Sequence, residues 1–453
     1  METKRWTRRG WLAAAGAMAC GPETPSSPDA TRGPRPRRTV LLRSGWQTEN
    51  IGDIAHTPGV LRLLSQNVSG IDVILWCNAL DRGVDNMLRR HFPAVRIVEG
   101  DTGEDGRPLG PELAQAFERA DFLLHGSGPS VVARRHVEAW RAVTGKPYGI
   151  FGVTISAGGE AASPAMDSGL RDLLNGAAFV FTRETASLEN VRRAGVTARS
   201  GFAPDGTFSL KILNEAAAAA VMAKFGLAPK KFIAVLPRLR YTPYHKFRAS
   251  ARWSEEQIRE REAVNARHAE GDHAKLREAI VRWVRETGHN ALLCAEMTYE
   301  LDILDPLLYR PLPEDVRRKV FKQPAYWLTD TAASLYRRAA AVISFECHSP
   351  IIAAANDTPC VYVRQPEDGI KGQMWRDIGL PRWVLEIETL NAAAVAERLM
   401  EIHGNRLAAE VQVHEAVVYA RSIQSKAIEA LRDVLWSRST AARVSARRPR
   451  IVT

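Results

Sequence analysis

The chain has 453 residues, of which 45% are hydrophobic and 25% are charged, and its formal net charge is +11. This composition is that of an ordinary globular protein, and it excludes a wholly disordered chain, a fibrous repeat and a polytopic membrane protein. The length predicts two domains, or three, each large enough to bury its own core.

The positive charge is concentrated at the two ends of the chain. Residues 1–38 contain eight Lys and Arg against three acids, and residues 438–453 contain five Arg and no acid, which leaves +1 for residues 39–437. A nearly neutral body with two basic tails does not predict a nucleic-acid-binding domain. The C-terminal tail predicts either a disordered extension or peripheral adhesion to an anionic cell envelope.

The N-terminal segment has the pattern of an export signal. Arg8 and Arg9 precede a short, weakly apolar run ending at Ala19, which is typical of a twin-arginine (Tat) signal and too short to span a bilayer. Cys20 follows a poor lipidation motif, and residues 21–38, rich in Pro, Ser and Arg, predict a flexible linker. We therefore expect a periplasmic or other extracytoplasmic protein. The alternative is a basic extension on a cytoplasmic one.

From residue 39 onward, short apolar runs alternate with helical patterns. Strands are predicted over 39–43, 71–76, 95–98, 122–124, 148–154 and 179–182. Helices are predicted between them, over 54–65, 83–91, 111–119, 130–143 and 184–194. This alternation predicts a parallel sheet with helices on both faces.

The same alternation restarts after an Ala-rich helix over 213–226 and a hinge at 229–231. Strands are predicted over 232–236, 291–294, 341–345, 360–363 and 384–387. Helices are predicted over 273–287, 331–339, 349–356, 391–403 and 406–435. The fold class is therefore α/β, with an N-terminal Rossmann-like domain (39–215) and a C-terminal one (228–437) facing each other across a cleft. The charged segment 241–272 is predicted to be a helical insertion or lid.

Cysteine and histidine spacing gives no sign of a metal centre. The four cysteines of the body, at 77, 294, 347 and 360, form no CxxC pair, so a zinc site is not predicted. Cys77 and Cys294 lie in strand-like runs and are predicted to be core residues. Asp272 and His273 are interpreted as surface residues. We expect neither a metal nor a cofactor.

Three loops carry candidate functional residues. The loop after the first strand contains Asn50, Gly52 and Asp53, which can meet an anion or simply cap the next helix. The Gly126-Ser127-Gly128 loop allows close approach of backbone to a ligand, or is only a tight turn. His348 stands at a strand end beside a helix N-terminus, where it can donate a proton or bind a phosphate, although a lone His is usually structural.

Taken in order, these motifs resemble the polysaccharide pyruvyl transferase family. The resemblance covers about residues 40–400 and rests on the motifs Asn50-Ile51-Gly52-Asp53, Gly126-Ser127-Gly128, Arg183-Glu184-Thr185-Ala186-Ser187, Asp205, Val235-Leu236-Pro237-Arg238 and Ser344-Phe345-Glu346-Cys347-His348. It implies a GT-B-like fold of two facing Rossmann-like domains. It also implies transfer of a pyruvyl group from phosphoenolpyruvate to a sugar of an envelope or extracellular polysaccharide, as a ketal.

The resemblance also implies roles for individual residues. Arg183, Arg238 and His348 would bind the anionic donor, since the planar guanidinium matches carboxylate and phosphate groups. The other substrate-binding residues would be Asn50, Gly52, Gly126, Ser127, Gly128 and Asp205. The acids and bases for the chemistry would be Asp53, His348 and Glu346, with no individual assignment.

One position departs from the family pattern. Where the family has Arg-x-His, this chain has Glu346-Cys347-His348. A carboxylate facing an anionic donor at ~4 Å costs about 4 kcal/mol at an effective dielectric constant of about 20. Either the donor is an anion other than phosphoenolpyruvate, or another arginine, Arg240 or Arg364, compensates. The predicted export also argues against phosphoenolpyruvate as the donor, because phosphoenolpyruvate is a cytoplasmic metabolite. The glutamate at position 346 and the predicted export both indicate a divergent member of the family.

Two other functions fit the same sequence. One is a glycosyltransferase that uses a sugar nucleotide, in which Glu346 would hold a ribose or sugar hydroxyl. The other is a non-catalytic carbohydrate-binding relative that kept the fold and lost the donor site.

Overall fold

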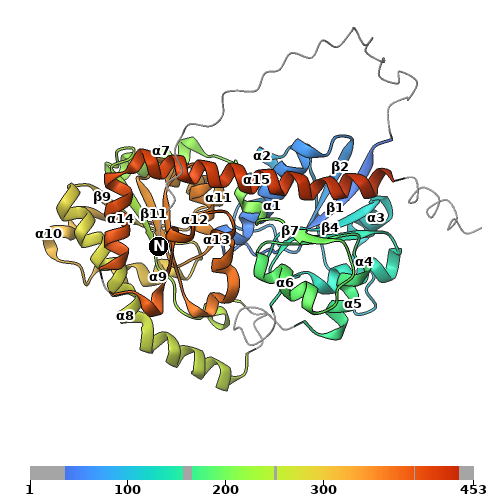
Figure 1. Ribbon diagram of the computed structural model, residues 1–453, viewed down its shortest axis with the longest axis horizontal. Helices are drawn as coiled ribbons and strands as arrows, with labels where there is room; N and C mark the ends of the chain where they lie inside the picture. Colours follow the sequence, from blue (N-terminus) through green and yellow to red (C-terminus); the bar gives the residue numbers. More distant parts are fainter. Residues whose placement is uncertain (1–35, 157–165, 249–252, 392, 438–453) are drawn as a thin grey trace, which may run out of the picture. The chain divides into compact units, whose positions relative to one another are not determined.

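Two parallel β-sheets, one after the other in the sequence, form the framework of the protein (Figure 1). The structure is a computed structural model and describes residues 36–156, 166–248, 253–391 and 393–437. The predicted export signal, nearly all of the linker and the C-terminal Arg tail lie outside these residues. Among the helices that are described, none is both long enough and apolar enough to cross a membrane.

The first sheet belongs to the N-terminal half and has the strand order β3-β2-β1-β4-β5-β6-β7, with every pairing parallel. Its strands are β1 (Arg38–Arg43), β2 (Ile71–Cys77), β3 (Arg96–Glu99), β4 (Phe122–His125), β5 (Tyr148–Val153), β6 (Val180–Thr182) and β7 (Ser200–Phe202). The helices of this half are α1 (Ile51–Asn67), α2 (Val84–His91), α3 (Pro111–Arg119), α4 (Arg134–Thr144), α5 (Ser168–Gly176) and α6 (Thr185–Arg193). The 3-10 turn η1 (Gly206–Ser209) and helix α7 (Glu215–Phe225) lead to the second sheet.

The second sheet belongs to the C-terminal half and has the order β10-β9-β8-β11-β12-β13, again wholly parallel. Its strands are β8 (Phe232–Leu236), β9 (Asn290–Leu293), β10 (Val320–Lys322), β11 (Ala341–Ser344), β12 (Cys360–Arg364) and β13 (Val384–Glu386). The helices of this half are α8 (Glu255–Thr287), α9 (Glu300–Ile303), α10 (Glu314–Arg317), α11 (Thr329–Arg338), α12 (His348–Ala354), α13 (Gln373–Asp377), α14 (Ala394–Gly404) and α15 (Arg406–Trp436).

The predicted fold class is confirmed, because each sheet has the Rossmann strand order. In both sheets the order reverses between the first strand and the fourth, so the switch points lie between β1 and β4 and between β8 and β11. Ligands of doubly wound folds bind outside the carboxyl ends of the strands at such points. The candidate loops 44–53 and 126–128 follow β1 and β4, and the candidate loop 345–348 follows β11.

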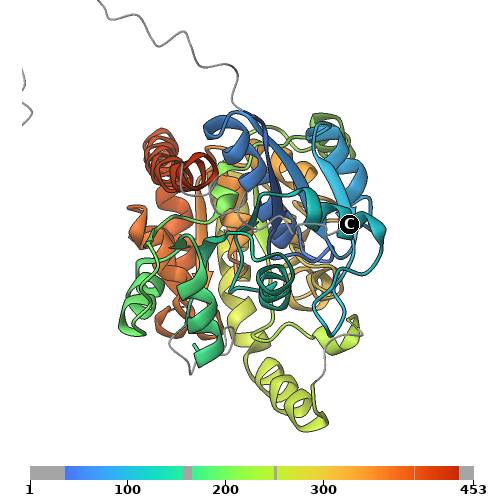
Figure 2. The same ribbon diagram turned by 90° about the vertical axis from the view of Figure 1, so that its right-hand side faces the viewer.

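The 241–272 segment, predicted to be a helical insertion or lid, is largely helical but is not separate from the helix predicted over 273–287. Residues 255–287 form one continuous helix, α8, whose first turns are largely exposed and stand away from the strands (yellow-green in Figure 2). The interpretation of Asp272 and His273 as surface residues is wrong, since both are buried. A continuous helix keeps one face on the sheet, where Asp272 pairs with Arg240 and His273 packs against Phe345.

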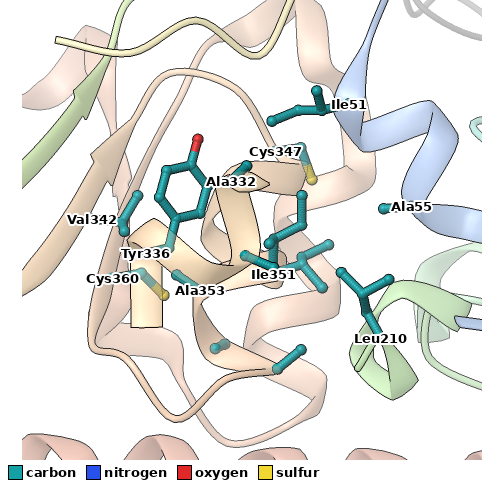
Figure 3. Close-up of a cluster of buried hydrophobic side chains, with 14 of the residues drawn as sticks. Ile51, Ala55, Leu210, Ala332, Tyr336, Val342, Cys347, Ile351, Ala353 and Cys360 are labelled. Atoms are coloured by element: carbon teal, nitrogen blue, oxygen red, sulfur yellow. The ribbon is translucent and has the colours of Figure 1, made fainter. Parts of the chain in front are cut away.

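Both sheets belong to one compact unit that begins at Arg37, and the helices that link them include α15 and α12. Helix α15, red in Figure 1, packs on α1 and β7 of the N-terminal half and on α12 and α14 of the C-terminal half. Helix α12 packs on α1, and Figure 3 shows Cys347 and Ile351 facing Ile51, Ala55 and Leu210. The four described cysteines are free and buried, which confirms the core positions predicted for Cys77 and Cys294.

Candidate active site

The loop after β1 ends in a capped helix. Asn50 has extended backbone, and its side-chain oxygen accepts hydrogen bonds from the backbone N–H of Gly52 (2.6 Å) and Asp53 (3.2 Å). This is the N-cap geometry that satisfies the free N–H groups of a first helical turn. Asn50 therefore fixes the start of α1, and Asp53 in the first turn keeps its carboxylate for other partners.

Backbone hydrogen bonds join this loop to the loop after β9. The N–H of Ile51 donates to the carbonyl of Glu296 (3.0 Å), and the N–H of Thr298 donates to the carbonyl of Glu49 (3.0 Å). Asn50 and Met297 form an antiparallel bridge between them. The carboxyl ends of strands from the two sheets are thereby held together, and side chains from both halves reach one site.

Gly52 allows the closest approach of the two halves. A Cβ atom at this position would lie 2.4 Å from Cβ of His348 and 2.6 Å from Oε1 of Glu296. Contacts this short do not occur between real side chains, so only glycine lets His348 lie against the first turn of α1. The role of Gly52 in this structure is to admit the His348 side chain.

His348 begins α12 and lies beside a buried glutamate. Its Nδ1 is 3.4 Å from Oε1 of Glu296, whose other oxygen accepts a hydrogen bond from the N–H of Ser349 (2.6 Å). Burial lowers the pKa of His348, so the imidazole is neutral at physiological pH. Burial also raises the pKa of Glu296, to about 7.

On the N-terminal side, Asp205 contacts three polar groups. Its carboxylate accepts from Nη1 of Arg183 (2.8 Å) and from the N–H of Thr207 (2.9 Å), and it lies 3.0 Å from Nδ1 of His56. Although burial would raise the pKa of Asp205, His56 and Arg183 hold it well below its usual range. Asp205 is therefore ionised and rigidly held.

Arg183 is more enclosed than a donor-binding role predicts. Its side chain has no exposed surface, and it contacts Glu184 (3.0 Å) and Thr154 (2.8 Å) as well as Asp205. Among the described residues nothing accepts a hydrogen bond from its Nη2. Arg183 thus holds the two carboxylates in place, and a single donor nitrogen remains for another group.

Glu346, at the position where the resemblance led us to expect an arginine, has a cation beside it. Nε of Arg238 lies 3.1 Å from Oε1 of Glu346, and Nη1 of Arg238 donates to Asp368 (2.5 Å). Burial raises the pKa of Glu346, and burial together with the charges of Glu346 and Glu296 raises the pKa of Glu300 well above its usual range. Glu346 therefore holds a proton more readily than a surface glutamate, which weakens its repulsion of an anion.

The compensating arginines predicted from the sequence are paired elsewhere. Arg240 makes a two-pronged contact with Asp272 (2.5 and 3.0 Å), and Arg364 contacts Glu386 (2.6 Å). Both guanidinium groups are therefore already neutralised by carboxylates that are not part of the site.

The Gly126-Ser127-Gly128 loop is buried and packs on other loops. A Cβ atom at Gly126 would lie 2.3 Å from Oγ of Ser44, and the carbonyl of Ser127 accepts from the N–H of Gly45 (3.0 Å). Oγ of Ser127 accepts from the N–H of Gly206 (2.7 Å). This loop supports the 44–53 loop and the turn after Asp205, and its contact with a ligand stays a prediction.

A pocket opens beside Asp53. It has a volume of about 340 Å³ and is lined by Trp46, Gln47, Thr48, Glu49, Asn78, Ala79, Asp81, Phe247 and Arg248. Nε2 of Gln47 donates to the Asp53 carboxylate and lies 3.4 Å from the hydroxyl of Tyr244, in the 3-10 turn η2 (Tyr244–Lys246). Gln47 therefore connects the Asp53 carboxylate to a space whose lining combines aromatic side chains, amides and carboxylates.

The sequence analysis missed His56, Glu296 and Glu300. His56 is three residues after Asp53 on a predicted helix, and this spacing puts both on one face. Glu296 and Glu300 follow an apolar strand, as the candidate residues predicted in the other loops do. These signals were present in the sequence, but their convergence depends on pairing between the loops of two different sheets.

The chain matches the polysaccharide pyruvyl transferase family model over residues 50–365. Among curated proteins there is no significant match. The matched segment begins at the cap of α1 and ends just after β12, so it contains Asp53, Arg183, Asp205, Arg238, Glu296, Glu346 and His348, whereas Asp368 and the pocket residues 46–49 lie outside it.

Solved structures of GT-B-type sugar-nucleotide enzymes share the fold. S. aureus MnaA, solved with UDP, has a TM-score of 0.54 at 11% identity, covering 88% of this chain and 97% of that chain. The UDP-GlcNAc 2-epimerase of Neisseria meningitidis, bound to UDP-GlcNAc, has a TM-score of 0.53 at 12% identity, covering 87% and 100%. At such identities the likeness concerns the GT-B-like fold alone. Because the family model spans most of the sequence, the chain belongs to the polysaccharide pyruvyl transferase family.

Proposed function

We propose that the protein transfers a pyruvyl group from an enol phosphate, phosphoenolpyruvate in the simplest case, to two hydroxyls of a sugar in an envelope polysaccharide. The observation that carries this proposal is the meeting of Asp53 and His348, from opposite halves, across Gly52. Arg238 and Glu346 lie on the same side of the site as His348. Together they offer a base, a neutral imidazole, a cation and an acid.

The reaction needs a proton at the methylene carbon of the donor and removal of protons from two sugar hydroxyls. Once the methylene is protonated, the first hydroxyl oxygen bonds to the adjacent carbon. The second hydroxyl then replaces the phosphate, which leaves with its bonding electrons. Buried carboxyls such as Glu296, with a pKa of about 7, can give and take protons near neutral pH. Asp53, whose side chain is 14% exposed, is the carboxylate best placed to accept a hydroxyl proton.

The 340 Å³ pocket beside Asp53 supports a sugar acceptor. Trp46 and Phe247 offer apolar faces for a sugar ring, and Gln47, Asn78 and Asp81 offer partners for its hydroxyls. The export signal predicted for residues 1–38 would bring the protein to acceptors of the cell envelope, and this location is part of the proposal.

The test is incubation of the full chain with phosphoenolpyruvate and a panel of envelope glycans. We expect phosphate release that depends on the glycan, together with a ketal-linked pyruvyl group on the glycan by mass spectrometry. His348→Gln should abolish both signals. A folded wild-type protein that releases no phosphate with any acceptor would refute this donor.

A sugar-nucleotide transferase is the competing function, because the structurally similar S. aureus and N. meningitidis proteins were solved with UDP or a UDP-sugar. Thermal-shift titration separates the two. Stabilisation by phosphoenolpyruvate without a response to UDP favours the pyruvyl transferase, and the opposite pattern favours the competitor. Glycan binding with no turnover of either donor would indicate a non-catalytic relative.

A further inference from the structure

Three potential metal ligands meet at the junction of the two halves. Asp53 and His56 lie one turn apart on α1, and His348 begins α12. One ligand atom of each of the three residues lies within 4.8 Å of those of the other two. The two imidazole rings are perpendicular with centroids 4.7 Å apart, and Nε2 of His56 is 3.7 Å from Oδ1 of Asp53.

A carboxyl group lies on the far side of each imidazole ring, within hydrogen-bond distance at His56 and in a longer contact at His348. Nδ1 of His56 is 3.0 Å from Oδ1 of Asp205, and Nδ1 of His348 is 3.4 Å from Oε1 of Glu296. A carboxylate behind the imidazole sets the tautomer that leaves the other nitrogen with a lone pair. In both residues that other nitrogen is Nε2.

The two carboxylates are themselves fixed. Asp205 accepts hydrogen bonds from Arg183 and Thr207, and Glu296 accepts one from the N–H of Ser349. A rigid outer layer of this kind holds metal ligands in position before the ion arrives.

The Nε2 atoms are the unexplained feature of this cluster. Both are buried, and within the described part of the chain neither takes part in a hydrogen bond. Leaving two buried imidazole nitrogens without partners is costly unless something binds them. We propose that Asp53, His56 and His348 bind one divalent transition-metal ion, in a two-histidine, one-carboxylate site.

The ligand types indicate which ions fit. Two imidazoles with one carboxylate suit Zn²⁺, Co²⁺, Mn²⁺ or Fe²⁺, whereas Mg²⁺ and Ca²⁺ prefer oxygen ligands alone. Three protein ligands leave positions of the ion open, as in catalytic rather than structural sites. Oδ2 of Asp53 keeps its hydrogen bond from Gln47, so ion binding through Oδ1 leaves that contact intact.

The ion would solve the charge problem created by Glu346, and this part of the inference rests on the proposed function. Seven carboxyl groups surround the site, those of Asp53, Glu184, Asp205, Glu296, Glu300, Glu346 and Asp368. Within the described ranges, the arginine and lysine side chains that contact them are Arg183, Arg238 and Lys371. A divalent ion adds two positive charges where an anionic donor must bind, next to these carboxyl groups.

The experiment titrates Co²⁺ and Zn²⁺ into the full chain after treatment with chelator, in the absence of donor and acceptor. Co²⁺ absorbance and calorimetry should give one ion per chain. His56→Gln should weaken affinity about 100-fold or more, since Gln can still donate to Asp205 but offers no imidazole, and Glu296→Gln should weaken it about 10-fold. The control is His414→Gln, an exposed histidine paired with Asp357, which should bind as the wild type does.

Thermal unfolding without metal establishes that each variant is folded, and Asp53→Asn replaces His56→Gln if the latter does not fold. The proposal is overturned if the wild type binds neither ion, or if affinity is unchanged in both folded variants. The proposed function is judged separately. Phosphate release that persists at the full rate in chelator would show that the reaction needs no metal, and the proposed transferase function would stand. Specific metal binding without turnover of any donor would support the metal site and contradict the proposed function.

Discussion

Asp205 of the N-terminal half and Glu296 of the C-terminal half are buried carboxyl groups of opposite character. On the N-terminal side, Arg183 and His56 keep Asp205 ionised, with its pKa well below the usual range. On the C-terminal side, burial raises the pKa of Glu296 and Glu300, and the nearest arginine is shared with Asp368. Asp205 therefore holds its neighbouring side chains in place, whereas Glu296 can exchange protons near neutral pH.

The largest effect on turnover is expected from removing the partly exposed Asp53 carboxylate on the N-terminal side. Asp53→Asn should lower the rate of phosphate release by about 100- to 10,000-fold, because the amide can neither accept a proton nor bind a cation well. The measurement is turnover at saturating donor. Asp172→Asn, a surface change on a residue paired with Arg141, is the control and should leave the rate intact. Full activity in Asp53→Asn would show that this side takes no part in the chemistry.

The two arginines sharpen the comparison. Arg183→Met should cost about 3–5 kcal/mol in the free energy of unfolding, because it leaves Asp205 and Glu184 buried without their cation. Arg238, which is 11% exposed, should instead affect the donor, so Arg238→Lys should raise the donor KM more than it lowers stability. Urea unfolding and initial rates measure these effects. A stability loss that is larger for Arg238→Lys than for Arg183→Met would reverse the assignment.

Gly52 sets the distance between the two sides. Gly52→Ala places a methyl group 2.4 Å from Cβ of His348, and such overpacking should cost about 1–3 kcal/mol and reduce turnover. Gly271→Ala is the matched control, since Gly271 lies within α8 with no atom within 4 Å of the added methyl group. That variant should gain about 0.5–1 kcal/mol. Equal melting temperatures for the two variants would contradict the close approach described here.

The smallest effect is expected from the buried acid of the C-terminal side. The pKa of Glu300 is raised in the folded protein above its ordinary value of 4.5. Its contribution to the free energy of unfolding is therefore fully present below pH 4.5 and is lost as the pH rises through the pKa of the folded state. Glu300→Gln cannot lose a proton, so its melting temperature should fall less between pH 5 and 9. At pH 5 the free energies of unfolding of the wild type and Glu300→Gln should agree within about 1 kcal/mol. Parallel pH profiles would mean that Glu300 is ionised when folded.

Most of the fold could be predicted from the sequence because its central strands are long apolar runs. Every predicted strand is present, but β7 and β10 were missed, and each is a three-residue strand at the edge of its sheet. Three residues are too few to establish an alternating pattern, and an edge strand is only partly buried. The predicted boundary between residues 272 and 273 is wrong. The first turns of α8 are exposed and rich in charged residues, so the composition of 241–272 gave no sign that the same helix continues into the buried part.

The site could be predicted in part. The loops after β1 and β11 were identified from strand ends, and Asp53 and His348 do meet. The carboxyl groups behind the two histidines, Asp205 at His56 and Glu296 at His348, come from loops far apart in the sequence. Spacing along the chain carries no information about such contacts, so the enclosure of Arg183 and the pairing of Glu346 with Arg238 required the structure.

The central claim is tested most directly by the product formed on the glycan. Wild-type protein incubated with phosphoenolpyruvate and an envelope glycan should yield a ketal-linked pyruvyl sugar and one phosphate per ketal, and Asp53→Asn should yield neither. Phosphate release without the ketal, or an equal yield from Asp53→Asn, would contradict pyruvyl transfer at the junction of the two halves.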